Sequence, residues 1–226
     1  MNKASIVFDM DGTLLDSLKD IASNFNSTLA YYGLKTYPIS MYREMLGYGP
    51  IQTFKKTIPQ SLVDDDLFIN ELVNHFKKTY WENAFTYSTP YEGIIEMLKE
   101  IQMKCDLAVF SNKPQALLEY ITSHYFSDID FKYIQGSGSS PYLKPEKESV
   151  DVLVKRSGFS KENILFVGDT VIDAKTAKAA NLKSVGVTWG MGNEEDLVSL
   201  GMTSIVNTVD ELKKLILQFS FSHSTY

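Results

Sequence analysis

Two closely spaced carboxylates near the amino terminus are the residues of this sequence best suited to do chemistry. Residues 5–17 read SIVFDMDGTLLDS, so Asp9 and Asp11 follow a short apolar run and precede Gly12 and the hydroxyl of Thr13. Neighbouring carboxylates repel each other unless a cation lies between them or one of them is protonated. Such oxygen ligands suit Mg²⁺, which often binds one or two protein carboxylates and a substrate phosphate. The stretch indicates a metal site or an acid–base pair, although an Asp-Gly turn with exposed acids is the structural alternative.

A second candidate site follows another apolar run. Ser111 and Asn112 come directly after the sequence LAVF at 107–110, and Pro114 then favours the start of a helix. Backbone amides at a helix start attract anions, so a hydroxyl and free amides would meet at the carboxyl end of a predicted strand. The pair could bind an anionic group, although Ser-Asn is also a common turn sequence.

Two further acids and a lysine complete the set of candidates. After the run ILFV at 164–167, the sequence GDTVID puts Asp169 at the predicted strand end and Asp173 four residues later, on the same face of the next helix. Lys144, which precedes a proline, would supply the positive charge that an anionic substrate requires. Helix capping is the alternative for Asp173, and a single lysine is usually solvated. Asp169, at the strand tip, is the better candidate for a metal ligand.

The order of these motifs resembles that of the haloacid dehalogenase (HAD)-like hydrolases, from about Ile6 to Trp189. The resemblance implies that Asp9 is a nucleophile and that Asp11 is the general acid and base. It also implies that Asp173 acts from behind the metal ligands or as a further ligand. The candidate substrate-binding residues are Thr13, Ser111, Asn112, Lys144 and Arg43. The candidate metal ligands are Asp9, Asp11, Asp169 and Asp173, with Mg²⁺ as the expected cofactor.

The elements that must position these residues follow from the hydrophobic pattern. Apolar residues at helical spacing over 18–32 predict a helix that ends at Gly33, and residues 16–90 contain no clear strand run. We expect buried strands at 5–8, 107–110, 164–167 and 184–187, with weaker candidates at 132–135 and 204–206. The pattern predicts an α/β fold with a doubly wound parallel, Rossmann-like sheet. Residues 1–15 and 91–226 would form this domain, and residues 16–90 a small all-helical domain inserted into it.

Composition limits the classes of function. The 226 residues are 44% hydrophobic and 22% charged, as in a soluble globular protein, and the formal net charge of −6 argues against general binding of nucleic acids. The single cysteine, Cys105, excludes an internal disulfide and fits a cytoplasmic location. We find no run long enough for a signal peptide or a membrane span. The tail after Gln218 shows no helical stripe, and we expect it to fray.

The position of the insertion, between the first and second motifs, resembles the helical cap of the phosphoglycolate phosphatase-like and β-phosphoglucomutase-like branch of the HAD family. The stretches at 46–50, 90–93 and 187–190 are most similar to phosphoglycolate phosphatases. The resemblance implies a Mg²⁺-dependent phosphatase that hydrolyses a small phosphomonoester through an aspartyl phosphate.

Other functions stay open at this point. One alternative is a phosphomutase, and another is a phosphatase for nucleotides, sugar phosphates or pyrophosphate. A non-catalytic binding module would be expected to lose a motif residue, and none is missing. We expect a small phosphorylated metabolite as the partner, no nucleic-acid polymer and no membrane, and a chain that is a monomer or a homodimer.

Overall fold

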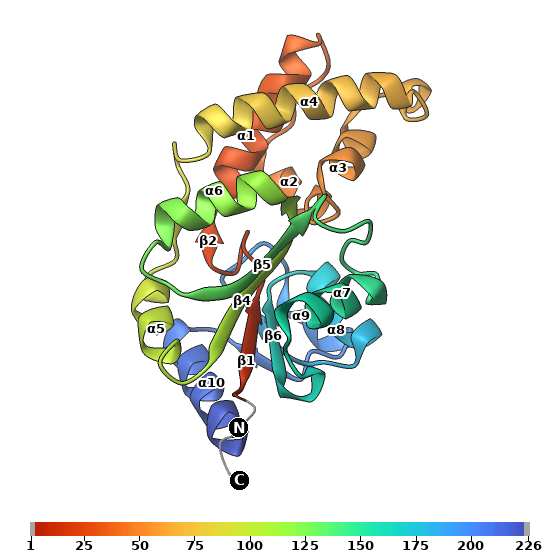
Figure 1. The fold of residues 1–226 in the computed structure, drawn as a ribbon. Helices are drawn as coiled ribbons and strands as arrows, with labels where there is room; N and C mark the ends of the chain where they lie inside the picture. The colour runs from red at the N-terminus through yellow and green to blue at the C-terminus, as the bar shows by residue number, and fades with distance from the viewer. Residues whose placement is uncertain (1–2, 224–226) are drawn as a thin grey trace.

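The apolar run at residues 5–8 forms a fully buried strand, β1 (Ser5–Phe8), at the centre of a six-stranded sheet in the computed structural model, which describes residues 3–223. The other strands of the sheet are β4 (Asp106–Pro114), β5 (Phe131–Ser137), β6 (Ile164–Gly168), β7 (Lys183–Val187) and β8 (Ser204–Val206). Every neighbouring pair is parallel, and the order is β5-β4-β1-β6-β7-β8 (Figure 1). The doubly wound parallel sheet is confirmed, including its two weaker strands.

Helices cover both faces of the sheet, as the near-continuous apolar runs of its strands require. They are α5 (Ile94–Ile101), α6 (Gln115–Tyr125), α7 (Lys147–Ser157), α8 (Val171–Ala180), α9 (Glu194–Ser199) and α10 (Val209–His223). Successive side chains of β1 point to opposite faces, so Ile6 and Phe8 pack in one core cluster with α5 and α10. Val7 packs in another cluster with residues of α7 and α8. Hydrophobic burial on both faces therefore holds β1 rigidly between its neighbours.

The strand register aligns the carboxyl ends of β1 and β6, whereas β4 continues to Pro114, so Ser111 and Asn112 lie within this strand and not directly after it. Phe8 is the Cα partner of Val109 in β4 and of Val167 in β6, and the amide of Asp9 donates to the carbonyl of Val167 at 2.9 Å. The first residues after β1 and β6 therefore leave the sheet side by side. In a doubly wound sheet this is the edge where the winding reverses and ligands bind.

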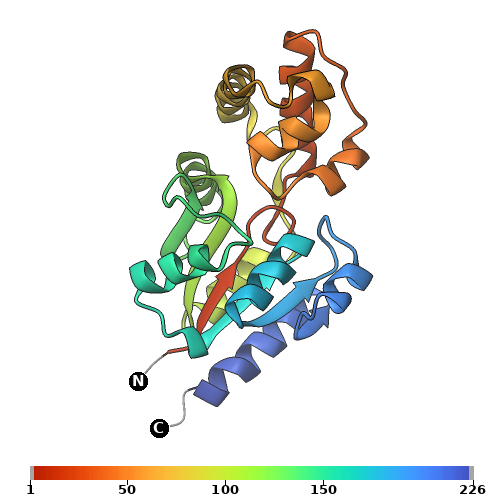
Figure 2. The same ribbon diagram turned by 90° about the vertical axis from the view of Figure 1, so that its right-hand side faces the viewer.

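Residues 16–90, here called the helical insertion, lie beyond this edge of the sheet (Figures 1 and 2). The helices of the insertion are α1 (Leu18–Tyr31), α2 (Tyr42–Met45), α3 (Pro50–Thr57) and α4 (Asp66–Asn83), with 3-10 turns at Ile39–Met41 and Gln60–Leu62. Phe25 of α1 lies at the centre of its aromatic core, with ring centroids 5.8, 4.8 and 4.2 Å from those of Tyr42, Phe54 and Phe76. These rings belong to the same continuous cluster of buried residues as Ile6 and Phe8 of β1, so the packing of the insertion continues into the core of the sheet.

The two ends of the helical insertion pair with each other. Strand β2 (Leu15–Asp16) is antiparallel to β3 (Thr89–Pro90), a short ladder that the sequence analysis did not anticipate. Next to it, the buried carboxylate of Asp20 accepts hydrogen bonds from the amides of Tyr87 and Ser88 and from the Ser88 hydroxyl. The chain therefore enters and leaves the insertion along one fixed path.

The carboxyl-terminal helix extends further than the sequence indicated. Helix α10 continues to His223, so the prediction of fraying after Gln218 is wrong for residues 219–223. Phe219 is buried in the same cluster as α5, which supplies the packing that stabilises the last turns. Within residues 3–223, no helix combines the length and apolarity that crossing a membrane requires.

Candidate active site

Three carboxylates converge at the edge where β1 and β6 end. Asp9 is the first residue after β1 and Asp169 the first after β6, while Asp173 lies in the first turn of α8. One oxygen from each side chain lies within 4.8 Å of the other two, and all three residues are buried. Buried carboxylate oxygens at this spacing are the donor set that a hard divalent cation such as Mg²⁺ uses.

Lys144 is the cation of this cluster. Its Nζ atom lies 3.0 Å from Oδ1 of Asp9 and 2.7 Å from Oδ1 of Asp173, and its side chain is 2% exposed. Burial by itself lowers the pKa of a lysine, but the neighbouring carboxylates of Asp173 and Asp9 raise the pKa of Lys144 above its ordinary value. The ammonium therefore stays charged and links the acids that follow β1 and β6.

The cluster carries more negative charge than one lysine can balance. Burial raises the pKa of Asp9, Lys144 opposes this, and Asp173 and Asp11 raise it further, so that the pKa of this carboxyl is about 7. Burial, Asp173 and Asp9 likewise raise the pKa of Asp169 well above its usual range. A divalent cation between these oxygen atoms would favour their ionised forms, so the residues present fit such a cation.

Asp169 is held by residues from two distant loops. Its Oδ1 accepts a hydrogen bond from the Thr13 hydroxyl at 2.8 Å, and its Oδ2 accepts one from the amide of Met191 at 2.7 Å. Gly12 has a φ of +88°, and a Cβ atom there would lie 2.2 Å from Oδ2 of Asp169. The turn after β1 therefore requires glycine, and Thr13, proposed from the sequence for substrate binding, orients Asp169 in this structure.

Asp173 caps α8, which was the structural alternative for it, and its other carboxylate oxygen contacts Lys144. Its Oδ2 accepts hydrogen bonds from the amide and the hydroxyl of Thr170, which form a capping box at the start of α8. Its Oδ1 accepts from Lys144. The capping box therefore fixes the carboxylate of Asp173, and this carboxylate in turn orients the ammonium of Lys144.

Asp11 is separated from the cluster of three acids. Its Oδ1 accepts a hydrogen bond from the Ser17 hydroxyl at 2.6 Å and lies 3.0 Å from Nζ of Lys113. The carboxylate of Asp11 is not in the group that could share one cation among residues 3–223. Metal binding by its side chain stays a prediction that this arrangement does not support.

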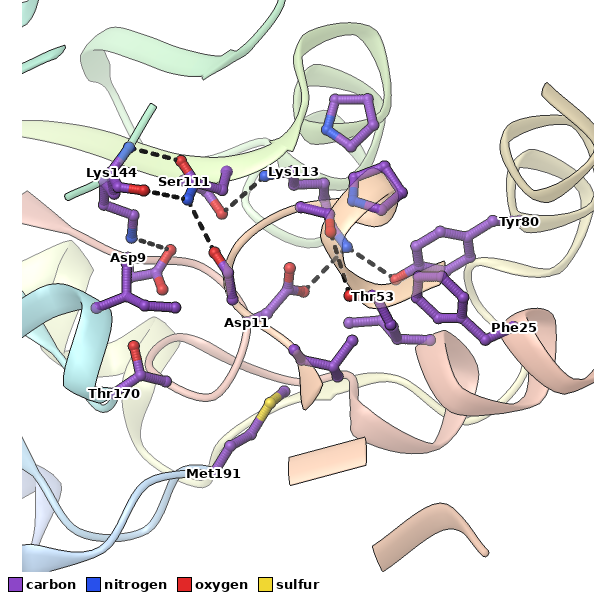
Figure 3. A pocket seen from close by; sticks show the side chains of 18 of the residues that line it. Asp9, Asp11, Phe25, Thr53, Tyr80, Ser111, Lys113, Lys144, Thr170 and Met191 are labelled. Carbon is purple, nitrogen blue, oxygen red and sulfur yellow. Dashed lines mark hydrogen bonds and ion pairs between the residues drawn. The ribbon is translucent and has the colours of Figure 1, made fainter. Parts of the chain in front are cut away.

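A pocket that is partly open to solvent lies between the sheet edge and the helical insertion (Figure 3). Its lining includes Asp9, Asp11, Ser111, Asn112 and Lys144 from the sheet side and Arg43, Phe76 and Tyr80 from the insertion. The structure thus brings most of the predicted residues to one cavity, whereas Thr13, Asp169 and Asp173 are not among its lining residues.

Asn112 and Arg43 connect the parts that surround the pocket. Asn112 donates to the carbonyl oxygens of Lys144 and of Gly47 in the insertion, both at 2.8 Å, and accepts from the amide of Lys144 at 2.9 Å. Arg43 donates to the carbonyl of Gly190 at 2.9 Å. Asn112 therefore fixes the backbone that carries Lys144, and Arg43 bridges the insertion and the loop after β7.

The sequence analysis missed Lys113, which lines the same pocket. Its side chain is 3% exposed and lies between Asp11 and Tyr80 of the insertion. The available signal was its position directly after Ser111 and Asn112, at the end of a strand whose neighbouring residues already suggested anion binding.

This fold and this arrangement of carboxylates are those of a HAD-like hydrolase. The family model described as haloacid dehalogenase-like hydrolase matches residues 6–187, and the chain belongs to this family. A phosphoglycolate phosphatase of Aquifex aeolicus is 34% identical over 186 residues, which cover 82% of this chain and 84% of the relative. A phosphoglycolate phosphatase of Pseudomonas fluorescens is 28% identical over 215 residues, which cover 93% and 78%. The crystal structure of a predicted phosphoglycolate phosphatase from Haemophilus somnus superposes with a TM-score of 0.85 at 25% identity, covering 95% of this chain and 98% of that one.

Proposed function

We propose that the protein is a Mg²⁺-dependent phosphatase that hydrolyses a small phosphomonoester through an aspartyl phosphate, with 2-phosphoglycolate as the first substrate to test. The observation that carries the proposal is that Lys144 contacts Asp9 directly within a cluster of buried carboxylates. The relatives named phosphoglycolate phosphatase support the same reaction. A phosphatase needs a nucleophile, positive charge for the phosphoryl oxygens and a proton donor, and each has a candidate here.

Asp9, Asp169 and Asp173 are the residues that would hold the magnesium ion. When bound, Mg²⁺ would neutralise negative charge on the transferring phosphoryl group. The protein contributes the fixed geometry of the ligands, since Thr13 and the Met191 amide orient Asp169.

Asp9 is the nucleophile in this proposal. The Met10 amide and the Lys144 ammonium both contact Oδ1 of Asp9, so the proposed attacking atom is Oδ2. Attack on phosphorus forms the bond from Oδ2 to phosphorus and breaks the bond to the leaving oxygen. Lys144 and the Ser111 hydroxyl would bind the phosphoryl oxygens, on which charge is spread during the transfer.

Asp11 is the proposed general acid and base. It would give a proton to the leaving oxygen in the first step and take one from the attacking water in the second, so that the alcohol and inorganic phosphate are released and Asp9 is regenerated. Asp11 lines the pocket but lies outside the cluster of three acids, which suits a group that exchanges protons with the substrate.

The helical insertion is the proposed cap domain, with residues 1–15 and 91–226 as the core domain. The pocket is lined from both sides, so the insertion can exclude bulk water and contact the leaving group. Arg43, which lines the pocket, is the cation of the insertion proposed to contact the substrate.

A panel assay tests the proposal. Release of inorganic phosphate is measured with Mg²⁺ for 2-phosphoglycolate, sugar phosphates, nucleoside monophosphates and pyrophosphate. We expect phosphate release that stops on chelation and returns when Mg²⁺ is added. Transfer of the phosphoryl group between sugar positions without phosphate release would favour a mutase, and turnover indifferent to chelation would contradict the role of the metal.

A further inference from the structure

The ammonium of Lys113 joins the helical insertion to Asp11. Lys113 lies in β4, and its Nζ atom is 3.0 Å from Oδ1 of Asp11 and donates to the hydroxyl of Tyr80 at 2.8 Å (Figure 3). All three residues line the pocket. A lysine whose side chain is 3% exposed needs such partners to offset its lost hydration, so the two contacts fix the place of the ammonium.

Tyr80 belongs to the rigid part of the helical insertion. It is 1% exposed near the end of α4, and its ring centroid lies 5.4 Å from that of Phe76, which stacks on Phe25 of α1. A change in the position of the insertion must therefore move the Tyr80 hydroxyl, and with it one of the two groups that hold the lysine.

The carboxylate of Asp11 is held by contacts from the sheet and from the start of the insertion. Its Oδ1 has two partners, the Lys113 ammonium from the sheet and the hydroxyl of Ser17 directly before α1. Charge-assisted contacts of this kind are the stronger ones, so the lysine has the larger influence on where the carboxylate points. The backbone amide of Lys113 also donates to the Ser111 hydroxyl at 3.3 Å, which ties the same residue to the proposed phosphoryl site.

We propose that Lys113 is a positioning residue which, held by Tyr80, sets the orientation of the Asp11 carboxylate and so couples proton transfer to the position of the insertion. The inference rests on the proposed function, because it requires that Asp11 protonates the leaving group. A lysine with only a stabilising role would affect all substrates alike. In the first step, a positioning role affects only those substrates whose leaving group needs a proton.

The test compares two esters in the wild type and in the variants Lys113→Met and Tyr80→Phe. One ester is the alkyl phosphate that the panel favours, whose alkoxide needs a proton, and the other is acetyl phosphate, whose acetate does not. We expect the single-turnover rate of leaving-group release, which reports the first step alone, to fall for the alkyl ester about 100-fold in Lys113→Met and about tenfold in Tyr80→Phe, because the acid is misplaced rather than removed. For acetyl phosphate we expect this rate to change less than about threefold, whereas hydrolysis of the aspartyl phosphate, in which Asp11 is the proposed base, should slow equally for both esters.

Tyr42→Phe is the matched control. Tyr42 is also a buried tyrosine of the insertion, and its hydroxyl donates to Asn26 at 2.8 Å, away from Lys113. This variant should lose stability without changing the ratio of the two single-turnover rates. In the double variant, Tyr80→Phe should add nothing to Lys113→Met, because the link is already broken.

The outcomes separate this inference from the proposed function. Equal losses of the first-step rate for both esters, or independent effects of the two substitutions on that rate for the alkyl ester, would overturn the inference in an otherwise active phosphatase. If Lys113→Met does not fold, Tyr80→Phe decides the question alone, since it removes only a hydroxyl. A wild type that hydrolyses no alkyl ester would overturn the proposed function and the inference with it.

Discussion

In the absence of divalent cations, the free energy of unfolding of this protein should decrease as the pH rises from about 4 to about 7. The cause is Asp9, whose pKa burial raises from 3.8 to about 7. Between these two values the folded protein binds a proton that the unfolded chain has already released, so the slope of stability against pH is negative. The contribution is fully present below the unfolded pKa and is lost once the pH exceeds the folded pKa.

The size of the effect follows from the shift. The pKa of Asp9 rises from 3.8 to about 7, a difference of roughly three pKa units. At about 1.36 kcal/mol per unit, this difference corresponds to about 4 kcal/mol in the free energy of unfolding. In a chain of 226 residues this is on the order of 10 °C in Tm. Mg²⁺ and the proton compete for the same carboxylate oxygens, and binding of the ion releases the proton. Stabilisation by Mg²⁺ should therefore be small near pH 5 and large above pH 7.

Thermal unfolding measured with chelator and with excess Mg²⁺, at pH values from about 5 to about 8, gives the required comparison. The difference between the two conditions at each pH removes the contribution of groups remote from the cluster. Asp169→Asn should abolish the dependence on Mg²⁺, whereas Asp128→Asn, at a carboxylate whose side chain is 71% exposed, should preserve it. A Mg²⁺ effect on Tm that is equal at all pH values would refute the reasoning.

Three substitutions test other parts of the site. Asp9→Asn should give a folded protein without detectable phosphate release, and full turnover would remove Asp9 from the nucleophilic role. Asp11→Ala should lower kcat for alkyl esters by roughly 10²–10⁴-fold in steady-state assays, and an unchanged kcat would exclude it as the general acid. Gly12→Ala should weaken Mg²⁺ binding in calorimetric titration, because its Cβ would collide with Asp169. Gly33→Ala is its control: φ is also positive, at +68°, but no atom lies within 4 Å of the added Cβ, so a normal affinity is expected there and a normal affinity in Gly12→Ala would contradict the clash.

The sheet and most of the pocket could be predicted because local sequence determines them. The runs at 6–8, 107–110 and 164–167 are apolar throughout since both faces of each strand are covered, and the polar residues that follow must lie at the carboxyl edge. The parallel register then brings the residues after β1 and β6 together without any further information.

Features that depend on tertiary contacts were beyond such reasoning. The β2–β3 ladder is too short to leave a periodic signal, and α10 continues past Gln218 because Phe219 finds a core to pack in. The partners of Lys113 come from positions 11 and 80, and only the folded chain brings them together. The orientation of Asp169 by Thr13 likewise joins residues 156 positions apart.

The ladder between β2 and β3 brings the two ends of the helical insertion together. Leu15 and Pro90 are Cα partners, so the chain returns to within one backbone pairing of the point where it left. The sheet therefore needs nothing from the intervening residues to complete its own connectivity, and a tight turn could take their place. Any other segment whose termini lie equally close could be grafted at this junction. The same carboxylates would then be covered by different residues, and the substrate specificity would change.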